Sequence, residues 1–265
     1  MPDKNLVKII ARPKLTSPNM LAAWPGISNV AMIVATYMAR KLEPKELAEL
    51  RSPHFFDPIG VLVKDSVVEE PQFPQNKFFY WKNKPGKSDI ILFIGEAQPQ
   101  AKGYELANAV LDVSVKYHVN RIYTCAAALT RIHHTEQPRV WGVGTNYELA
   151  KELGGRGLVQ NGSIQISGLN GLLLGVAKER GIDGLCLLGE VPAYTQRVQN
   201  PMAALAIVNV LKDMLDVEIN IDELAVYASE AKEQIKQVAA EAMEEYIDYF
   251  TEPIWEHGEE DEDNE

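Results

Sequence analysis

Cysteine is scarce in this sequence, and long apolar runs are missing. The 265 residues contain only two cysteines, Cys125 and Cys186, and each falls inside a predicted apolar strand. We therefore expect two buried, unreactive thiols and no disulfide framework, which fits a reducing compartment. No apolar run approaches the roughly 20 residues that cross a bilayer, and the first ten residues lack the apolar segment of a secretion signal. The expectation is a cytoplasmic protein without a membrane partner.

Positive charge is also in short supply. The formal net charge is −11, with 26 Lys and Arg against 37 Asp and Glu. Residues 251–265 hold eight acidic residues and no Lys or Arg, and without those eight the net charge is −3. We expect this acidic tail to be disordered. No basic stripe runs along the rest of the sequence, so nucleic acid is not expected as a partner.

The motifs of common catalytic and cofactor sites are absent. The glycine-rich stretch at residues 154–171 has neither the spacing of a phosphate-binding loop nor that of a dinucleotide-binding fingerprint. No serine lies in a G-x-S-x-G elbow. The only histidine cluster, His133-His134, has no further ligands at matched spacing. The sequence therefore predicts no catalytic residue, no cofactor and no metal site.

Apolar strands alternate with helical segments along most of the chain. Strand patterns occur at residues 5–10, 20–24, 59–63, 77–81, 88–95, 120–129, 139–145 and 183–190. Helical patterns occur at residues 30–42, 103–118, 146–153, 166–181 and 201–215, with one or two amphipathic helices at residues 221–250. The alternation predicts an α/β fold: a single domain over residues 1–220 with a twisted, mostly parallel sheet flanked by helices. Residues 221–250 would form a C-terminal helical extension, and residues 251–265 the tail.

Two short stretches of the sequence resemble each other, LFIGEAQP at residues 92–99 and LLGEVPAY at residues 187–194. In both, an apolar run ends in Gly-Glu and a proline follows. Parallel strands end on one edge of their sheet, where α/β folds bind ligands, so Glu96 and Glu190 are candidates for one cleft. They would either divide acid and base roles between them or accept hydrogen bonds from backbone N–H groups at helix N-termini. The other candidates for this cleft are Trp24, Asn29, Gln98 and Tyr194.

Several blocks of sequence, in this order, resemble the PAC-two family, named for the second subunit of the eukaryotic proteasome assembly chaperone. The blocks are AAWPGISNVA, FFD, EEPQFPQNKFFYW, IILFIGEAQP, PRVWGVGTN and, as the most specific, residues 168–211. The resemblance covers about residues 6–230 and is strongest to archaeal and bacterial members. It implies a single α/β domain similar to the purine nucleoside phosphorylase-like fold, assembled into homo-oligomers. It also implies a chaperone-like role with a protein partner.

The resemblance leaves two points open. Some archaeal members dock on the proteasome through a C-terminal hydrophobic–tyrosine–any-residue tail, whereas this chain ends in EEDEDNE, so docking by that route is not expected. The alternative function is a nucleoside- or nucleotide-binding enzyme of the phosphorylase type. There Glu190 would hold the ribose or base, Glu96 would transfer the proton, and Arg156 in the loop 154–168 would hold phosphate. A fold alone does not decide between these functions.

Overall fold

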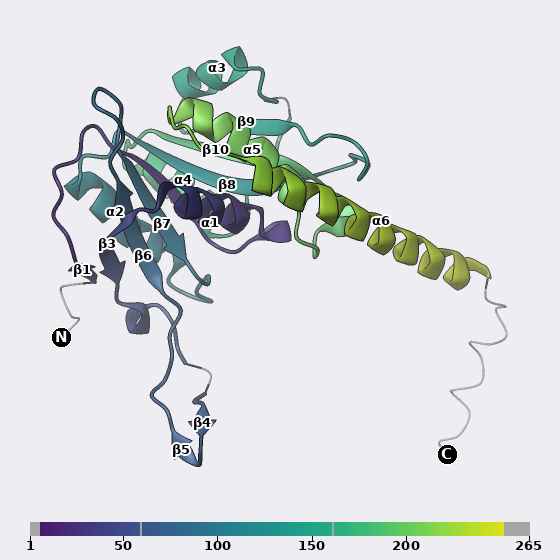
Figure 1. Ribbon diagram of the computed structural model, residues 1–265, viewed down its shortest axis with the longest axis horizontal. Coiled ribbons are helices and arrows are strands. Elements are labelled where there is room, and N and C mark those ends of the chain that lie inside the picture. The colour runs from purple at the N-terminus through teal and green to yellow at the C-terminus, as the bar shows by residue number, and fades with distance from the viewer. Residues whose placement is uncertain (1–5, 59, 161, 252–265) are drawn as a thin grey trace.

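The computed structural model describes residues 6–58, 60–160 and 162–251, and in the last helix it describes side chains only up to Gln237 and at Ala240. An eight-stranded sheet forms the centre of the molecule (Figure 1). Its strands, in spatial order, are β1 (Val7–Ile9), β3 (Lys45–Leu50), β6 (Asn76–Trp81), β7 (Ile90–Gly95), β2 (Asn19–Ala23), β8 (Arg121–Thr130), β10 (Gly184–Pro192) and β9 (Val140–Gly144).

The four central strands, β7, β2, β8 and β10, are parallel, and the strands on both sides of them are antiparallel. All residues of β2 and β10 are buried, as expected for strands covered on both faces. The predicted α/β fold is confirmed. Three strand assignments differ from the sequence prediction, one of them the short strand at Val67–Val68, which was not predicted. Residues 60–62 lie outside any strand, and residues 45–50 form β3, whose pattern is obscured by three charged side chains.

Helices cover both faces of the sheet. Helices α1 (Val30–Leu42) and α5 (Pro201–Met214) pack on one face, and α2 (Gly103–Lys116) and α4 (Leu169–Glu179) pack on the other. Helix α3 (Tyr147–Gly155) packs beside β9. Two large apolar cores result, one on each face of the sheet, and a third, small cluster contains Ala128, Leu174, Cys186 and Leu188. Both cysteines are fully buried in this sheet and neither forms a disulfide, as predicted.

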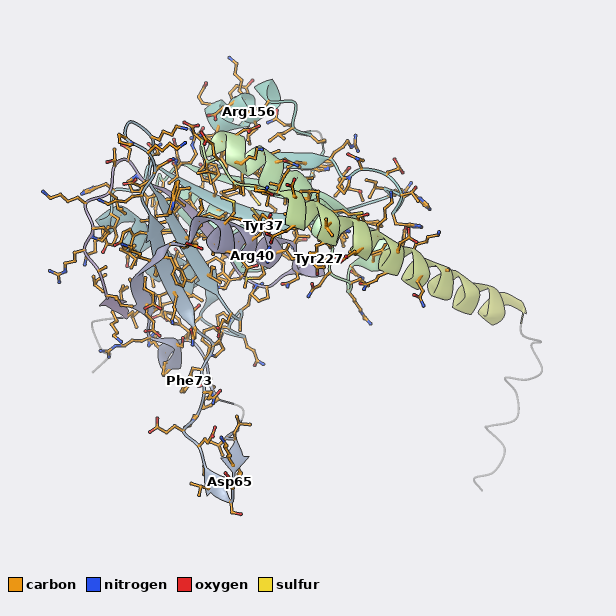
Figure 2. The ribbon with its side chains drawn as sticks, in the orientation of Figure 1. Tyr37, Arg40, Asp65, Phe73, Arg156 and Tyr227 are labelled. Carbon is orange, nitrogen blue, oxygen red and sulfur yellow. The ribbon has the colours of Figure 1, made fainter. Side chains whose placement is uncertain are left out.

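Two elements extend away from the sheet. The C-terminal segment forms a single helix, α6 (Asp222–Thr251), which packs on α5 and then projects beyond the body (Figure 1). Strands β4 (Val63–Lys64) and β5 (Val67–Val68) form a separate hairpin that projects in another direction, with Asp65 at its tip (Figure 2). The predicted acidic tail lies outside the described residues, apart from Thr251.

Candidate functional site

The candidate site lies at the edge of the sheet where the parallel strands β7, β2, β8 and β10 end, called here the strand-end edge. Helices α1 and α2 follow β2 and β7 directly, and α4 and α5 also begin at this edge. Helix α1 leaves β2 for one face of the sheet, whereas α2 leaves β7 for the other. In open α/β sheets such a divergence opens a crevice between two strand ends, and ligands bind there.

At this point in the sheet, the indole of Trp24 packs in the core on the face covered by α2 and α4. The side chain is fully buried, and its ring lies 4.8 Å from the ring of Phe93, centroid to centroid. Gly95 at the end of β7 makes room for it, because a Cβ there would overlap the indole. The protein's own core therefore extends to the ends of β2 and β7.

Asn170 and Gln98 hold the end of β2 in place. The backbone N–H of Trp24 donates to Asn170 Oδ1 at 3.0 Å, and Asn170 Nδ2 donates to the Trp24 carbonyl at 3.0 Å. Gln98 Nε2 donates to the Pro25 carbonyl at 2.5 Å, and Gln98 Oε1 accepts from the Leu169 N–H at 2.9 Å. These bonds connect the ends of β2 and β7 to the first turn of α4. Trp24 and Gln98, both predicted to line a cleft, thus fix the geometry of the edge.

Glu190 is a buried carboxylate whose partners are Arg139, directly before β9, and Trp141 on β9. Its side chain is 1% exposed, and it accepts hydrogen bonds from Arg139 Nη2 at 2.8 Å, Arg139 Nε at 3.0 Å, the Arg139 backbone N–H at 3.0 Å and Trp141 Nε1 at 3.2 Å. Burial acts to raise the pKa of Glu190, but these hydrogen bonds and the Arg139 charge outweigh it and hold the pKa below its ordinary value. The carboxylate is ionised and fully engaged.

Glu96 has a different environment. It is exposed, and it accepts the backbone N–H of Gln75 at 2.8 Å. Strands β2 and β8 lie between the strand that precedes Glu96 and the strand that carries Glu190. The structure therefore does not bring the two glutamates together as an acid–base pair. Both accept backbone N–H groups, although neither donor belongs to a helix N-terminus.

The loops after β2 and β10 are joined. Asn29 takes a left-handed conformation, with φ of 53°, directly before α1. The preceding Ser28 donates its hydroxyl to the Thr195 carbonyl at 3.3 Å, beside Tyr194. Tyr194 is 48% exposed, and its hydroxyl lies 2.9 Å from His134 Nδ1 and 3.1 Å from the His134 backbone nitrogen, which donates to it. Asn29 and Tyr194 thus lie in connected loops.

Helix α6 extends this surface. Tyr227 on α6 donates its hydroxyl to Gln199 at 2.7 Å, and Lys232 donates to the Thr135 carbonyl at 3.2 Å (Tyr227 is labelled in Figure 2). Below the loop at residues 130–139 lies a hollow of about 450 Å³ beside Arg139 and Glu190. The exposed surface of the strand-end edge therefore includes these loops, Tyr194 and the first half of α6.

Arg156 lies elsewhere. It follows α3 and contacts Glu152 at 3.9 Å, while Glu152 also accepts from Arg121 at the start of β8 (Figure 2). The start of β8 is at the opposite edge of the sheet from Glu96 and Glu190. The phosphorylase-type alternative assigns its substrate contacts to Glu190, Glu96 and Arg156. These three side chains thus lie in three separate environments.

In the part of the chain that the structure describes, no group of three or more His, Cys, Asp and Glu side chains is placed to hold a metal ion. Over the same residues, no helix combines the length and the apolar character needed to cross a membrane.

Three residues at the edge were not identified from the sequence, Asn170, Arg139 and His134 in its bond to Tyr194. Of the three, Arg139 could most easily have been found from the sequence. It lies two residues before Trp141 at the start of a predicted strand, so the two side chains are expected on the same face of the sheet. Its contact with Glu190 depends on the antiparallel pairing of β9 with β10, which places Val140 opposite Gly189. That register was not available from the sequence.

Comparisons with known proteins agree on one family. The model of the PAC2 family matches residues 20–239. An uncharacterized protein of Methanocaldococcus jannaschii is 28% identical over 240 residues, which cover 88% of this chain and 89% of that protein. The crystal structure of PbaB from Pyrococcus furiosus, described as an archaeal proteasome activator, is 28% identical with a TM-score of 0.75, over 88% of this chain and 98% of PbaB. PbaA from the same organism, described as an archaeal homolog of proteasome-assembly chaperone, is 25% identical with a TM-score of 0.67, over 91% of this chain and 99% of PbaA.

Proposed function

The chain belongs to the PAC2 family, and on this basis we propose that it is a homo-oligomeric, chaperone-like binding protein whose partner is a proteasome core particle. One observation carries the proposal. The similarity to PbaB, an archaeal proteasome activator, extends over nearly the whole of both chains rather than over a shared subdomain. We place this activity in the cytoplasm, where the two free thiols stay reduced.

The construction of the strand-end edge supports a binding role. A catalytic cleft needs open space next to reactive groups. At the ends of β2 and β7 the buried indole of Trp24 takes up the space, and the hollow at this edge lies beside Arg139 and Glu190. The carboxylate of Glu190 is saturated by Arg139 and Trp141. Such an edge presents a rigid, preorganised surface, which lowers the entropy that is lost when a partner binds.

We divide the predicted cleft residues into two roles. Trp24, Gln98 and Glu190 hold the edge in shape through buried contacts. Tyr194 and Glu96 are exposed and would contact the partner directly. Tyrosine suits this role, because its large, rigid side chain buries apolar area and keeps one polar group for hydrogen bonding.

The test is direct binding to the core particle of the proteasome from the same organism. The purified full-length protein is mixed with core particles and separated on a native gel, and peptide hydrolysis is measured in parallel. The proposal predicts comigration with the particle and a changed rate of hydrolysis. Absence of both at saturating protein would overturn it.

A pair of tyrosine variants shows whether the strand-end edge makes the contact. Tyr194→Ala should weaken binding, because Tyr194 is a central exposed aromatic of the edge. Tyr147→Ala is the matched control, since Tyr147 is 80% exposed and lies on α3 at the opposite edge. Equal binding by both variants would place the contact outside the strand-end edge.

A further inference from the structure

The projecting hairpin is built from apolar residues that have no cover in the described structure. We call residues 57–75 the arm, of which all but residue 59 are described. Five of its apolar side chains are about half or more exposed: Val61 (49%), Leu62 (60%), Val63 (64%), Val67 (67%) and Val68 (63%). Exposed apolar patches of this kind mark interaction sites on soluble proteins.

The arm has the form of a hairpin that needs a partner. Its two strands pair only with each other, at Val63 with Val68 and Lys64 with Val67. The turn residues Asp65 and Ser66 have φ of 49° and 65°, the left-handed values of the tight turn that matches the twist of a hairpin. An isolated two-stranded hairpin is marginally stable in water. Figure 2 shows Phe73 between the body and the tip at Asp65, so the hairpin stands clear of its own body.

A receptor for such a hairpin lies at the base of the arm. Within residues 6–58, 60–160 and 162–251, strand β1 is the outermost strand of the main sheet and pairs with β3 alone, so among these residues its other side is a free edge. Next to it is a hollow of about 610 Å³ lined by β1, the end of β3 and the base of the arm, including Leu6, Pro53 and Phe73. A free strand edge beside an apolar hollow is the setting in which an extended segment adds to a sheet.

The charges of the two surfaces are complementary. The arm carries Asp57, Asp65, Glu69 and Glu70 against a single Lys64, a net charge of −3. The two hollows that flank β1 are lined by the cations Lys8, Arg12, Arg51 and Lys116. Two acidic residues, Glu49 and Asp112, also line them. Glu49 is paired with Lys8 at 3.9 Å, and Asp112 is paired with Arg180 at 2.8 Å. An acidic, apolar arm thus matches a basic, apolar edge.

We propose that the arm of one copy of this chain adds to the free edge of β1 in a second copy, and that the second copy returns its arm to the first. The arm and the free edge of β1 lie side by side on the same chain. A single two-fold axis can therefore place each arm on the β1 edge of the other copy, as in an isologous dimer. The exchange covers the exposed valines and pairs the open backbone of β1. The inference rests on the proposed homo-oligomer and deepens it by naming the contact.

Cross-linking between introduced cysteines tests the contact. Cys125 and Cys186 are fully buried, so introduced thiols are the ones that react. One variant carries Val67→Cys on the arm, and a second variant carries Ile10→Cys beside β1. When the two variants are mixed, a short bis-maleimide should join them into covalent dimers. The control joins Val67→Cys with Val226→Cys, since Val226 is 58% exposed but lies on α6. Dimers in the first pair alone support the exchange, and no dimers there, or equal yields in both, overturn it.

A charge swap gives an independent readout. Arg12→Glu with Lys116→Glu should weaken self-association at least about tenfold, and added Glu69→Lys with Glu70→Lys should restore it. Failure of the second pair to restore association overturns the contact. A wild-type protein that stays monomeric at high concentration overturns it as well. Binding of that monomer to the core particle would show that the proposed partner stands while the exchange fails.

Discussion

Gly95 and Trp24 fit each other at the one place where this fold ordinarily leaves room for a ligand. A Cβ on residue 95 would overlap the indole of Trp24 and lie 3.0 Å from Asn76 Oδ1. The absence of one methyl group at the end of β7 thus allows the indole of Trp24 to pack against the end of that strand.

The first prediction concerns that fit. Gly95→Ala should lower the free energy of unfolding by about 1–3 kcal/mol, because the added methyl overpacks a rigid site. Gly175→Ala is the matched control: Gly175 lies inside α4 with nothing within 4 Å of its Cβ position. Its substitution should stabilise the protein by about 0.5–1 kcal/mol through helix propensity. Urea denaturation measures both, and equal effects would contradict the packing argument.

The second prediction concerns the ion pair between the buried Glu190 and the exposed Arg139. Glu190→Gln should cost about 2 kcal/mol of stability, since it removes charged hydrogen bonds to Arg139 from a buried side chain. Glu96→Gln should change stability by less than about 0.5 kcal/mol, because Glu96 is exposed. The comparison uses the same urea titrations. A larger loss for Glu96→Gln would reverse the assignment of the two glutamates.

The third prediction is a pH dependence with a defined sign. The pKa of Glu190 in the folded protein lies below its ordinary value of 4.5. Its contribution to stability is therefore complete above that value and is lost as the pH falls through the lowered folded pKa. Melting temperatures from about pH 7 to about pH 3 should fall more steeply for the wild type than for Glu190→Gln. Parallel curves would show that Glu190 is not the titrating group.

The fourth prediction concerns the thiols. Burial raises the pKa of Cys186 to about 12. Burial also raises the pKa of Cys125 well above its ordinary value. Neither thiol should react with an aromatic disulfide reagent in the folded protein at about pH 8, and both should react in guanidinium. Rapid labelling of the folded protein would contradict the burial of the two strands.

Much of the fold followed from periodicity. Strands β2, β8 and β10 are continuous apolar runs because helices cover both their faces. The helices that cover them are visible in the sequence as helical patterns. Strand β3 escaped prediction because Lys45, Glu46 and Glu49 face solvent near the sheet margin and interrupt the apolar pattern. Local signals describe the centre of the sheet better than its borders.

The site was less predictable, for a physical reason. The two similar stretches that end in Gly-Glu correctly placed Glu96 and Glu190 near strand ends. The hydrogen-bond partners of these glutamates, however, lie far along the chain. Glu190 depends on the register of β9, and Trp24 depends on Asn170, which is 146 residues away. Arg156 could not be placed either, because the side of the sheet to which α3 returns is a tertiary property. Contacts of long sequence separation leave no periodic trace in either partner.

The measurement that tests the central claim most directly is a native mass spectrum of the full-length protein, alone and mixed with the proteasome core particle of the same organism. The account predicts a homo-oligomer in the first spectrum and a complex of that oligomer with the particle in the second. A monomer that leaves the mass of the particle unchanged would contradict it. A small molecule retained by the protein and lost in Glu190→Gln would point instead to the enzyme alternative.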